Sequence, residues 1–171
     1  MALKLYKFKA EQLSRLITIK QQFADNTRIQ EIVDLHLIPK LQHLRVMDIA
    51  DYVFSLYLAS REFKVFEELI PSEETVDQLI ENKSKLYYFK AKYMCRLMRL
   101  RKELKAKYPE KAERIEEIVF DLATRLHVLR KDWLTMYLFS ATLACKEFSE
   151  FCALVPSDDE VKKIFVVPKE E

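Results

Sequence analysis

The residues with the clearest chemical potential are the lysines and arginines between positions 85 and 107. This stretch contains a single acidic residue, Glu103, and on a helical wheel its cations flank both sides of an apolar stripe. Clustered cations neutralise phosphates, so we predict contacts with the backbone of DNA or RNA. The predicted nucleic-acid contacts are Lys85, Lys90, Lys92, Arg96, Arg99, Arg101, Lys102 and Lys105.

A second interpretation of this basic stretch is purely structural. Acidic residues cluster around positions 62–77 and 147–160, and the net charge of the chain is only +2. The cations could therefore lie on a solvated helix face beside acidic helices, which is a common fate of charge runs. They could also dock on an acidic protein partner or on a neighbouring copy, so a homo- or hetero-oligomeric interaction module is the alternative function.

Catalytic patterns are absent from the sequence. The chain has no glycine, which excludes the glycine-rich phosphate loop, the dinucleotide fingerprint and the nucleophile elbow. His36, His43 and His127 have no accompanying metal-ligand motif, and zinc needs three or four convergent ligands. The neighbouring acids Glu116 and Glu117 point in different directions on a helix. We therefore expect a protein that is not an enzyme and needs neither cofactor nor metal.

The cysteines and aromatic residues are expected to serve the core. Three cysteines, Cys95, Cys145 and Cys152, are too few for a disulfide framework, so we expect core or boundary positions for them. Aromatic residues at helical spacing are more often core than binding site. The aromatic set assigned to the core is Phe54, Phe63, Phe66, Phe139, Phe148, Phe151 and Trp133.

An internal duplication organises the chain. Residues 52–80 align with residues 137–165 at a shift of 85, with 12 of 29 positions identical, and residues 5–10 align with 86–91 at a shift of 81. Blocks that repeat in the same order indicate a repeated supersecondary unit. We predict an all-α fold of two tandem three-helix units, packed as one helical bundle. The first repeat covers residues 1–80, and the second covers 81–171 and ends in an extended tail over 166–171.

Helical periodicity places three helices in each repeat. The first repeat has predicted helices over 5–23, 27–37 and 45–69, with the second helix interrupted at Pro39. The second repeat has predicted helices over 85–107, 110–129 and 131–154. Pro71 and Pro156 stop the third helices, and Ser72 and Ser157 then cap the segments that follow.

The overall functional expectation follows from these patterns. The N-terminus lacks the apolar stretch of a signal peptide, and no apolar run is long enough to span a membrane, so we expect a cytoplasmic or virion protein without membrane contact. The hypothesis that ranks first is a non-enzymatic nucleic-acid-binding assembly protein. Such a protein could be a nucleoprotein or capsid-type subunit of a virus or mobile element, or a helical subunit of a larger complex.

Overall fold

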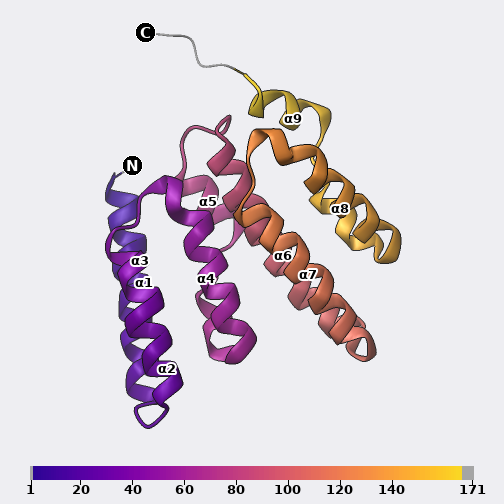
Figure 1. The fold of residues 1–171 in the computed structure, drawn as a ribbon. Coiled ribbons are helices and arrows are strands. Elements are labelled where there is room, and N and C mark those ends of the chain that lie inside the picture. Colours follow the sequence, from indigo (N-terminus) through magenta and orange to yellow (C-terminus); the bar gives the residue numbers. More distant parts are fainter. Residues whose placement is uncertain (1, 167–171) are drawn as a thin grey trace. The chain divides into compact units, whose positions relative to one another are not determined.

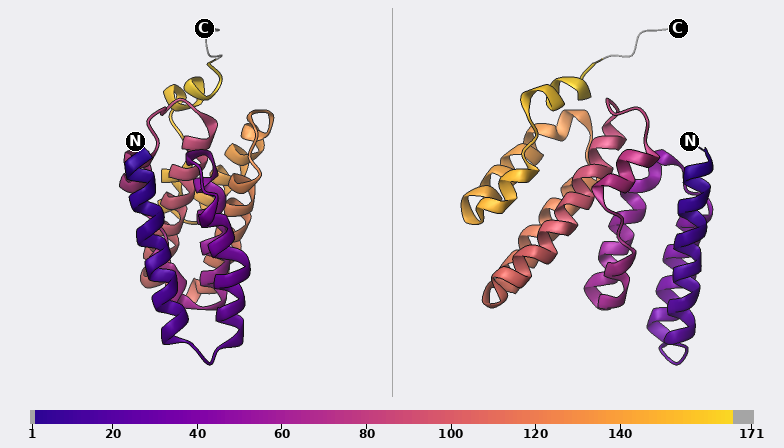
Figure 2. Two further views of the ribbon diagram at one scale, coloured as in Figure 1. Left: turned by 90° about the vertical axis from the view of Figure 1, so that its left-hand side faces the viewer. Right: turned by 180° about the vertical axis from the view of Figure 1, so that it is seen from behind.

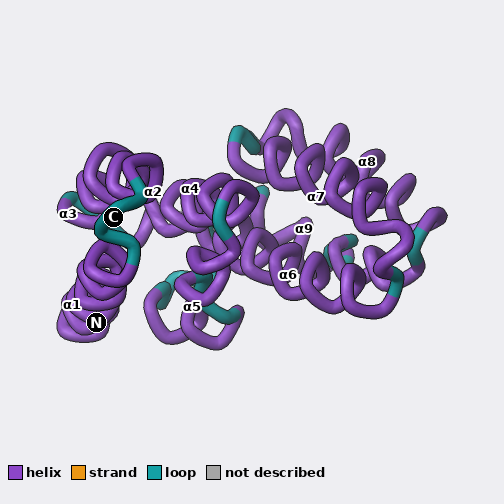
Figure 3. The backbone as a smooth tube through the Cα atoms, turned by 90° about the horizontal axis from the view of Figure 1, so that it is seen from below, coloured by secondary structure: helices purple, strands orange, loops and turns teal. Residues whose placement is uncertain are grey.

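The computed structural model describes residues 2–166, and over this range the backbone consists of helices and loops, with no β-strand (Figure 1, Figure 3). The all-α prediction is confirmed. No residue in this range has a positive φ angle, as expected for a sequence without glycine. The chain divides into two compact units, Met1–Glu81 and Asn82–Glu171, and each is described by itself.

The first unit begins with a helical hairpin. α1 (Ala2–Gln22) turns at residues 23–26 into a rod made of α2 (Thr27–Glu31), the π-helical segment η1 (Ile32–Leu37) and α3 (Ile38–Gln42). The side chain of Asn26 caps α2 by accepting a hydrogen bond from the backbone N–H of Ile29. α1 and this rod lie side by side, as the left-hand view of Figure 2 shows. Phe8, Leu16 and Ile19 form the buried face of α1.

The predicted interruption at Pro39 does not occur. Pro39 lies in the first turn of α3, and the helical rod continues through it to Gln42. The preceding turn is wider than an α-turn, because the N–H of Ile38 bonds to the carbonyl of Val33, five residues back. A wider turn gives the proline ring room beside the preceding carbonyls, which explains how the helix passes a residue that normally ends it.

The third predicted helix of the first unit is two elements. A 3₁₀ turn, η2 (Val46–Asp48), leads into α4 (Ile49–Glu62), which ends where Phe63 adopts an extended conformation with φ −139° and ψ 116°. The 3₁₀ segment η3 (Lys64–Leu69) then packs back against α4. This folding back buries Phe66 and Leu69. Burial of two large side chains outweighs the few helical hydrogen bonds lost at Phe63, so the prediction of one helix over 45–69 is wrong.

The second unit contains a pair of long helices. α6 (Leu86–Lys107) and α7 (Ala112–His127) are joined by the 3₁₀ turn η4 (Pro109–Lys111) and pack along each other (Figure 1). The turn η5 (Lys131–Trp133) leads into α8 (Leu134–Glu147), and the segment η6 (Ser149–Leu154) follows. Phe148, between α8 and η6, is extended with φ −135° and ψ 112°, so the single helix predicted over 131–154 is also wrong.

Both units end in a short helix with a serine cap. α5 (Glu73–Leu79) begins after Ser72, whose hydroxyl accepts the N–H of Thr75. α9 (Asp158–Ile164) begins after Ser157, which forms a reciprocal capping box with Glu160. The predicted serine caps are confirmed. The predicted extended tail lies outside the described residues, apart from Val166.

A buried tyrosine ties the end of the 3₁₀ segment to the core of each unit. In the first unit the Tyr52 hydroxyl donates to Gln12 Oε1 at 2.8 Å, and Gln12 Nε2 donates to the Leu69 carbonyl at 2.9 Å. In the second unit the Tyr137 hydroxyl donates directly to the Leu154 carbonyl at 2.9 Å. Burial raises the pKa of both tyrosines, which therefore stay neutral hydrogen-bond donors.

Candidate functional site

The predicted phosphate-binding cations all lie on or next to α6, whose observed range matches the prediction closely. α6 is partly a core helix, because its apolar stripe, including Phe89, Leu97 and Leu104, is buried. Lys85 is the N-cap residue and the other predicted contacts follow within the helix. The predicted phosphate-binding cations therefore flank the buried apolar stripe of α6.

Two of the predicted cations are committed to one carboxylate of α7. Arg101 Nε lies 2.9 Å from Glu116 Oε1, and the Arg101 side chain is among the few charged groups that are buried, at 7% exposure. Lys105 forms an ion pair with the same carboxylate. A buried guanidinium that already holds a carboxylate cannot reach a phosphate without leaving Glu116 unpaired, which is costly. The structure thus gives Arg101 and Lys105 an internal partner that sequence spacing did not reveal.

Most of the remaining predicted cations also have internal contacts. Arg96 Nη1 donates to the Ala153 carbonyl at 2.7 Å, and its guanidinium lies 4.3 Å from the centre of the Tyr93 ring. Arg99 pairs with Glu103 one helical turn away, and Lys92 donates to the Tyr88 hydroxyl. Lys90 also takes part in an interaction.

The side chains of Lys85 and Lys102 have no hydrogen bond or ion pair within residues 2–166, and both residues are at least partly exposed. They lie 17 positions apart, about 25 Å along an α-helix.

The basic helix of the first unit has a different environment. Lys20 pairs with Asp34 at 2.7 Å, and Lys9 donates to the carbonyl of Gln42. Lys4, Lys7 and Arg15 have no ion pair or hydrogen bond from their side chains within residues 2–166. These three cations line one cavity of about 490 Å³ between α1, residues 69–71 and α5.

A second cavity in the first unit, of about 430 Å³, continues along α1 and shares Arg15 with the first. Sequence reasoning missed the cationic cavity because its two walls, α1 and α5, lie some 70 residues apart. The basic character of α1 was the only sequence signal.

An exposed apolar face runs along α8. Phe139 is 67% exposed, Leu143 64% and Met136 57%, and Trp133 at the start of the helix is also exposed. Assignment of Phe139 and Trp133 to the core is therefore wrong, although Phe54, Phe66, Phe148 and Phe151 are buried as predicted. A cavity of about 270 Å³ next to this face is lined mainly by apolar side chains, with Met136 and Trp133 among them. We call the exposed side chains of Trp133, Met136, Phe139 and Leu143 the α8 face.

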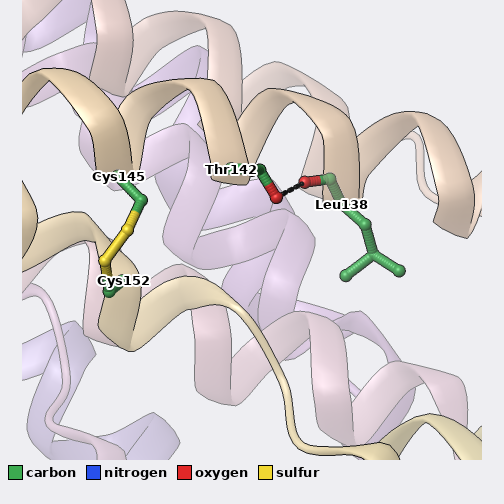
Figure 4. Close-up of a disulfide and its surroundings, with 4 residues drawn as sticks. All are labelled: Leu138, Thr142, Cys145 and Cys152. Atoms are coloured by element: carbon green, nitrogen blue, oxygen red, sulfur yellow. Dashed lines mark hydrogen bonds between the residues drawn. A yellow bond between two sulfur atoms is a disulfide. The ribbon is translucent and has the colours of Figure 1, made fainter.

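A disulfide joins Cys145 at the end of α8 to Cys152 in η6, with 4.7 Å between their Cα atoms (Figure 4). Cys145 is half-buried, which agrees with a boundary position, but Cys152 is exposed, so the expectation of a core or boundary position is wrong for Cys152. On one continuous helix their Cα atoms would be about 10 Å apart. The break at Phe148 folds η6 back onto α8 and brings the sulfurs together. Cys95 is buried, as predicted.

The titratable side chains within residues 2–166 do not converge on a reactive centre. No cluster of three or more His, Cys, Asp or Glu residues in this range could hold a metal ion. Two acids with a lowered pKa lie in surface ion pairs: hydrogen bonds from the Arg28 guanidinium lower the pKa of Glu62, and those from Arg114 lower that of Glu147. These shifts come from structural pairs at corresponding positions of the two units, not from a cleft.

Within the described residues, the helices are too short or too polar for any of them to pass through a bilayer. No family model matches this chain, and no match was found among curated proteins or among solved structures. Fold and surface chemistry are therefore the grounds for the functional argument.

Proposed function

We propose that this protein is a non-catalytic assembly subunit that works by binding other protein chains, and that its first partner is a second copy of itself. The observation that carries the proposal is the α8 face, a row of large apolar side chains exposed on one helix. Contiguous exposed apolar surface of this kind marks interaction sites, and aromatic and methionine side chains are enriched there.

The distribution of side chains along α8 favours a second copy as the occupant. No charged residue occurs between Leu134 and Cys145, so two such faces can meet without burying a charge. Antiparallel pairing of two α8 helices about a point between Phe139 and Ser140 places Met136 of each copy level with Leu143 of the other. This self-complementary pattern is what a two-fold interface requires.

Self-association tests the proposal directly. Sedimentation of the purified chain should show a monomer–dimer equilibrium with a Kd on the order of micromolar, since a few large side chains must offset the cost of association. Phe139→Asp should weaken the dimer at least about tenfold, because it would place a charge at the centre of the interface.

The matched control is Leu35→Asp, which changes an apolar residue of similar exposure, 66%, in the first unit. This variant should associate like the wild type. A wild-type chain that stays monomeric at all concentrations contradicts the proposal, as does equal weakening by both variants.

The two units are, we further propose, copies of one duplicated module. Support comes from paired details beyond the matching sequence blocks. Phe63 and Phe148 break the chain with nearly the same backbone angles. Arg28 holds Glu62 in the first unit through two hydrogen bonds of 2.9 Å, and Arg114 holds Glu147 in the second through bonds of 2.6 and 2.7 Å.

Nucleic-acid binding through α6 stays a second candidate function, favoured by its excess of cations over acids and by the unpaired Lys85 and Lys102. Fluorescence anisotropy with labelled duplex DNA, single-stranded DNA and RNA at low salt tests it. Binding should fall steeply with added salt and should be weakened by a Lys85→Glu, Lys102→Glu double variant. The control is Lys64→Glu, Lys163→Glu, which makes the same charge change elsewhere. Absence of binding at low salt would remove this candidate.

A further inference from the structure

The cationic cavity of the first unit has no assigned role, and its lining is chemically unusual. α1 contributes Lys4, Lys7 and Arg15, while Glu11 is the acidic residue among the lining side chains. The opposite wall is formed by residues 69–71 and by α5, including Thr75. The three cations have no ion pair within residues 2–166. Three cations against one carboxylate leave the lining with a net positive charge, which attracts an anion from solution.

The second unit shows which group occupies the corresponding place. The sequence alignment matches Arg15 with Arg96, Gln12 with Tyr93, and Thr75 with Glu160. Glu160 on α9 accepts a hydrogen bond of 2.8 Å from the Tyr93 hydroxyl on α6, and the Arg96 guanidinium lies over the Tyr93 ring. In the second unit, therefore, a carboxylate of the chain itself sits between the short helix and the basic helix.

The electrostatics of Glu160 indicate that its carboxylate is held in charged form. Burial by itself raises the pKa of Glu160, but hydrogen bonds from Tyr93 and Ser157 and the charge of Arg96 bring the pKa below its ordinary value. The first unit has Thr75 at this position and so lacks the carboxylate, while it keeps the arginine and has Lys7 where the second unit has Tyr88. The first unit therefore has the arginine of this site without a carboxylate on the short helix.

We propose that the cavity between α1 and α5 binds a carboxylate from outside the chain, supplied by an acidic segment of a partner protein. The Arg15 guanidinium provides a planar fork that suits a carboxylate, and Lys4 and Lys7 add charge. The volume of about 490 Å³ lies within the usual range of ligand sites and admits more than one acidic side chain. This proposal rests on the proposed protein-binding function and specifies the chemistry of a second partner site.

The test uses the full chain and a defined probe, an acetylated hexaglutamate peptide, in calorimetric titrations at low salt. Wild-type protein should bind the peptide, and its backbone amide NMR signals should shift in α1 and α5. Arg15→Met should weaken binding about tenfold or more, because a charge-assisted hydrogen bond is lost. Thr75→Glu copies the second unit and should fill the site with an internal carboxylate, so binding should also fall at least about tenfold.

Thr135→Glu is the matched control, since it adds the same charge at an exposed position of α8. This variant should bind the peptide like the wild type. No binding by the wild type, or equal loss in both glutamate variants, overturns the proposal. Binding of inorganic phosphate in preference to the peptide would show that the carboxylate class is wrong. Phe139→Asp should leave peptide binding unchanged, so failure of the α8 interface and failure of this site are separate results.

Discussion

Gln12 on α1 and Tyr93 on α6 align when the sequence is shifted by 81 positions, and the two side chains make different contacts. In the first unit Gln12 turns inward and bridges Tyr52 to the Leu69 carbonyl. In the second unit the Tyr137 hydroxyl donates to the Leu154 carbonyl without a bridging residue, and the buried Tyr93 instead donates to Glu160 on α9. Two aligned differences, Gln12 against Tyr93 and Thr75 against Glu160, thus accompany the presence of an internal carboxylate in the second unit.

The same contrast extends to the rest of each unit. In the first unit, the cations that line the cavity between α1 and α5 have no ion pair within residues 2–166. In the second unit, most cations of α6 contact partners within the unit, such as Glu116. The second unit instead exposes apolar side chains on α8, and it carries a disulfide where the first unit has Ser60 and Glu67. Corresponding scaffolds can therefore present a polar site in one place and an apolar face in the other.

The largest expected effect on stability concerns the hydrophobic core of each unit. Phe66 and Phe151 are both fully buried behind the break in the third helix. Replacement of either by alanine should lower the free energy of unfolding by about 3–5 kcal/mol, because it removes a large apolar side chain and leaves a cavity. Urea denaturation measures both losses. Effects that differ greatly between the two variants would show that the cores are not equivalent.

The disulfide should stabilise the second unit alone, because the first unit has Ser60 and Glu67 at the aligned positions. Reduction, or the Cys145→Ser, Cys152→Ser variant, should cost roughly 2 kcal/mol of unfolding free energy by releasing a short closed loop in the unfolded chain. Thermal melts with and without reductant measure this effect. The double variant itself is the control, since its melting temperature should not respond to reductant. A wild-type chain with the same melt under both conditions would contradict a stabilising bond.

Removal of the hydroxyl group from each buried tyrosine should cause a smaller loss of stability, and the loss should differ between the two units. Tyr52→Phe should cost about 1–3 kcal/mol, because it leaves the buried Gln12 carbonyl oxygen without its donor. Tyr137→Phe removes a single bond to a backbone carbonyl and should cost about 1 kcal/mol. Urea titrations of the two variants side by side give the comparison. A larger loss for Tyr137→Phe would contradict the bridging role of Gln12.

The smallest effect is the acid response of the surface pairs. Hydrogen bonds from Arg28 lower the pKa of Glu62, and those from Arg114 lower the pKa of Glu147. A carboxyl group whose pKa is lowered by folding adds stability above its unfolded value, here 4.5, and that stability is lost as the pH falls through the folded value. Both pairs should therefore contribute fully at neutral pH and fade in acid.

Melting temperatures between pH 7 and pH 3 test this response. The gap between wild type and Arg28→Met should stay constant above about pH 5 and close below it, and Arg114→Met should behave in the same way. Because these groups are exposed, added salt should shrink both gaps. A gap that widens in acid would give the wrong sign and contradict the pairing.

Local sequence signals were sufficient for the helices whose packing follows their own periodicity. α6 was predicted over 85–107 and is observed over Leu86–Lys107, because its apolar stripe and the following proline define it locally. Serine caps were predictable for the same reason. The breaks at Phe63 and Phe148 were not predictable, since the benefit of burying Phe66 and Phe151 arises only when the 3₁₀ segment meets the helix before it.

The sequence by itself determined an all-helical chain, its capped short helices and the repeated pattern of apolar residues, because these depend on neighbours within a few turns. Tertiary structure decided which charges are used internally and which remain open. Arg101 meets Glu116 and Glu160 meets Tyr93 only after distant segments pack together, and Lys4, Lys7 and Arg15 surround a cavity only because α5 lies opposite them. Charge pairing and cavities depend on distances in space, which composition and periodicity do not contain.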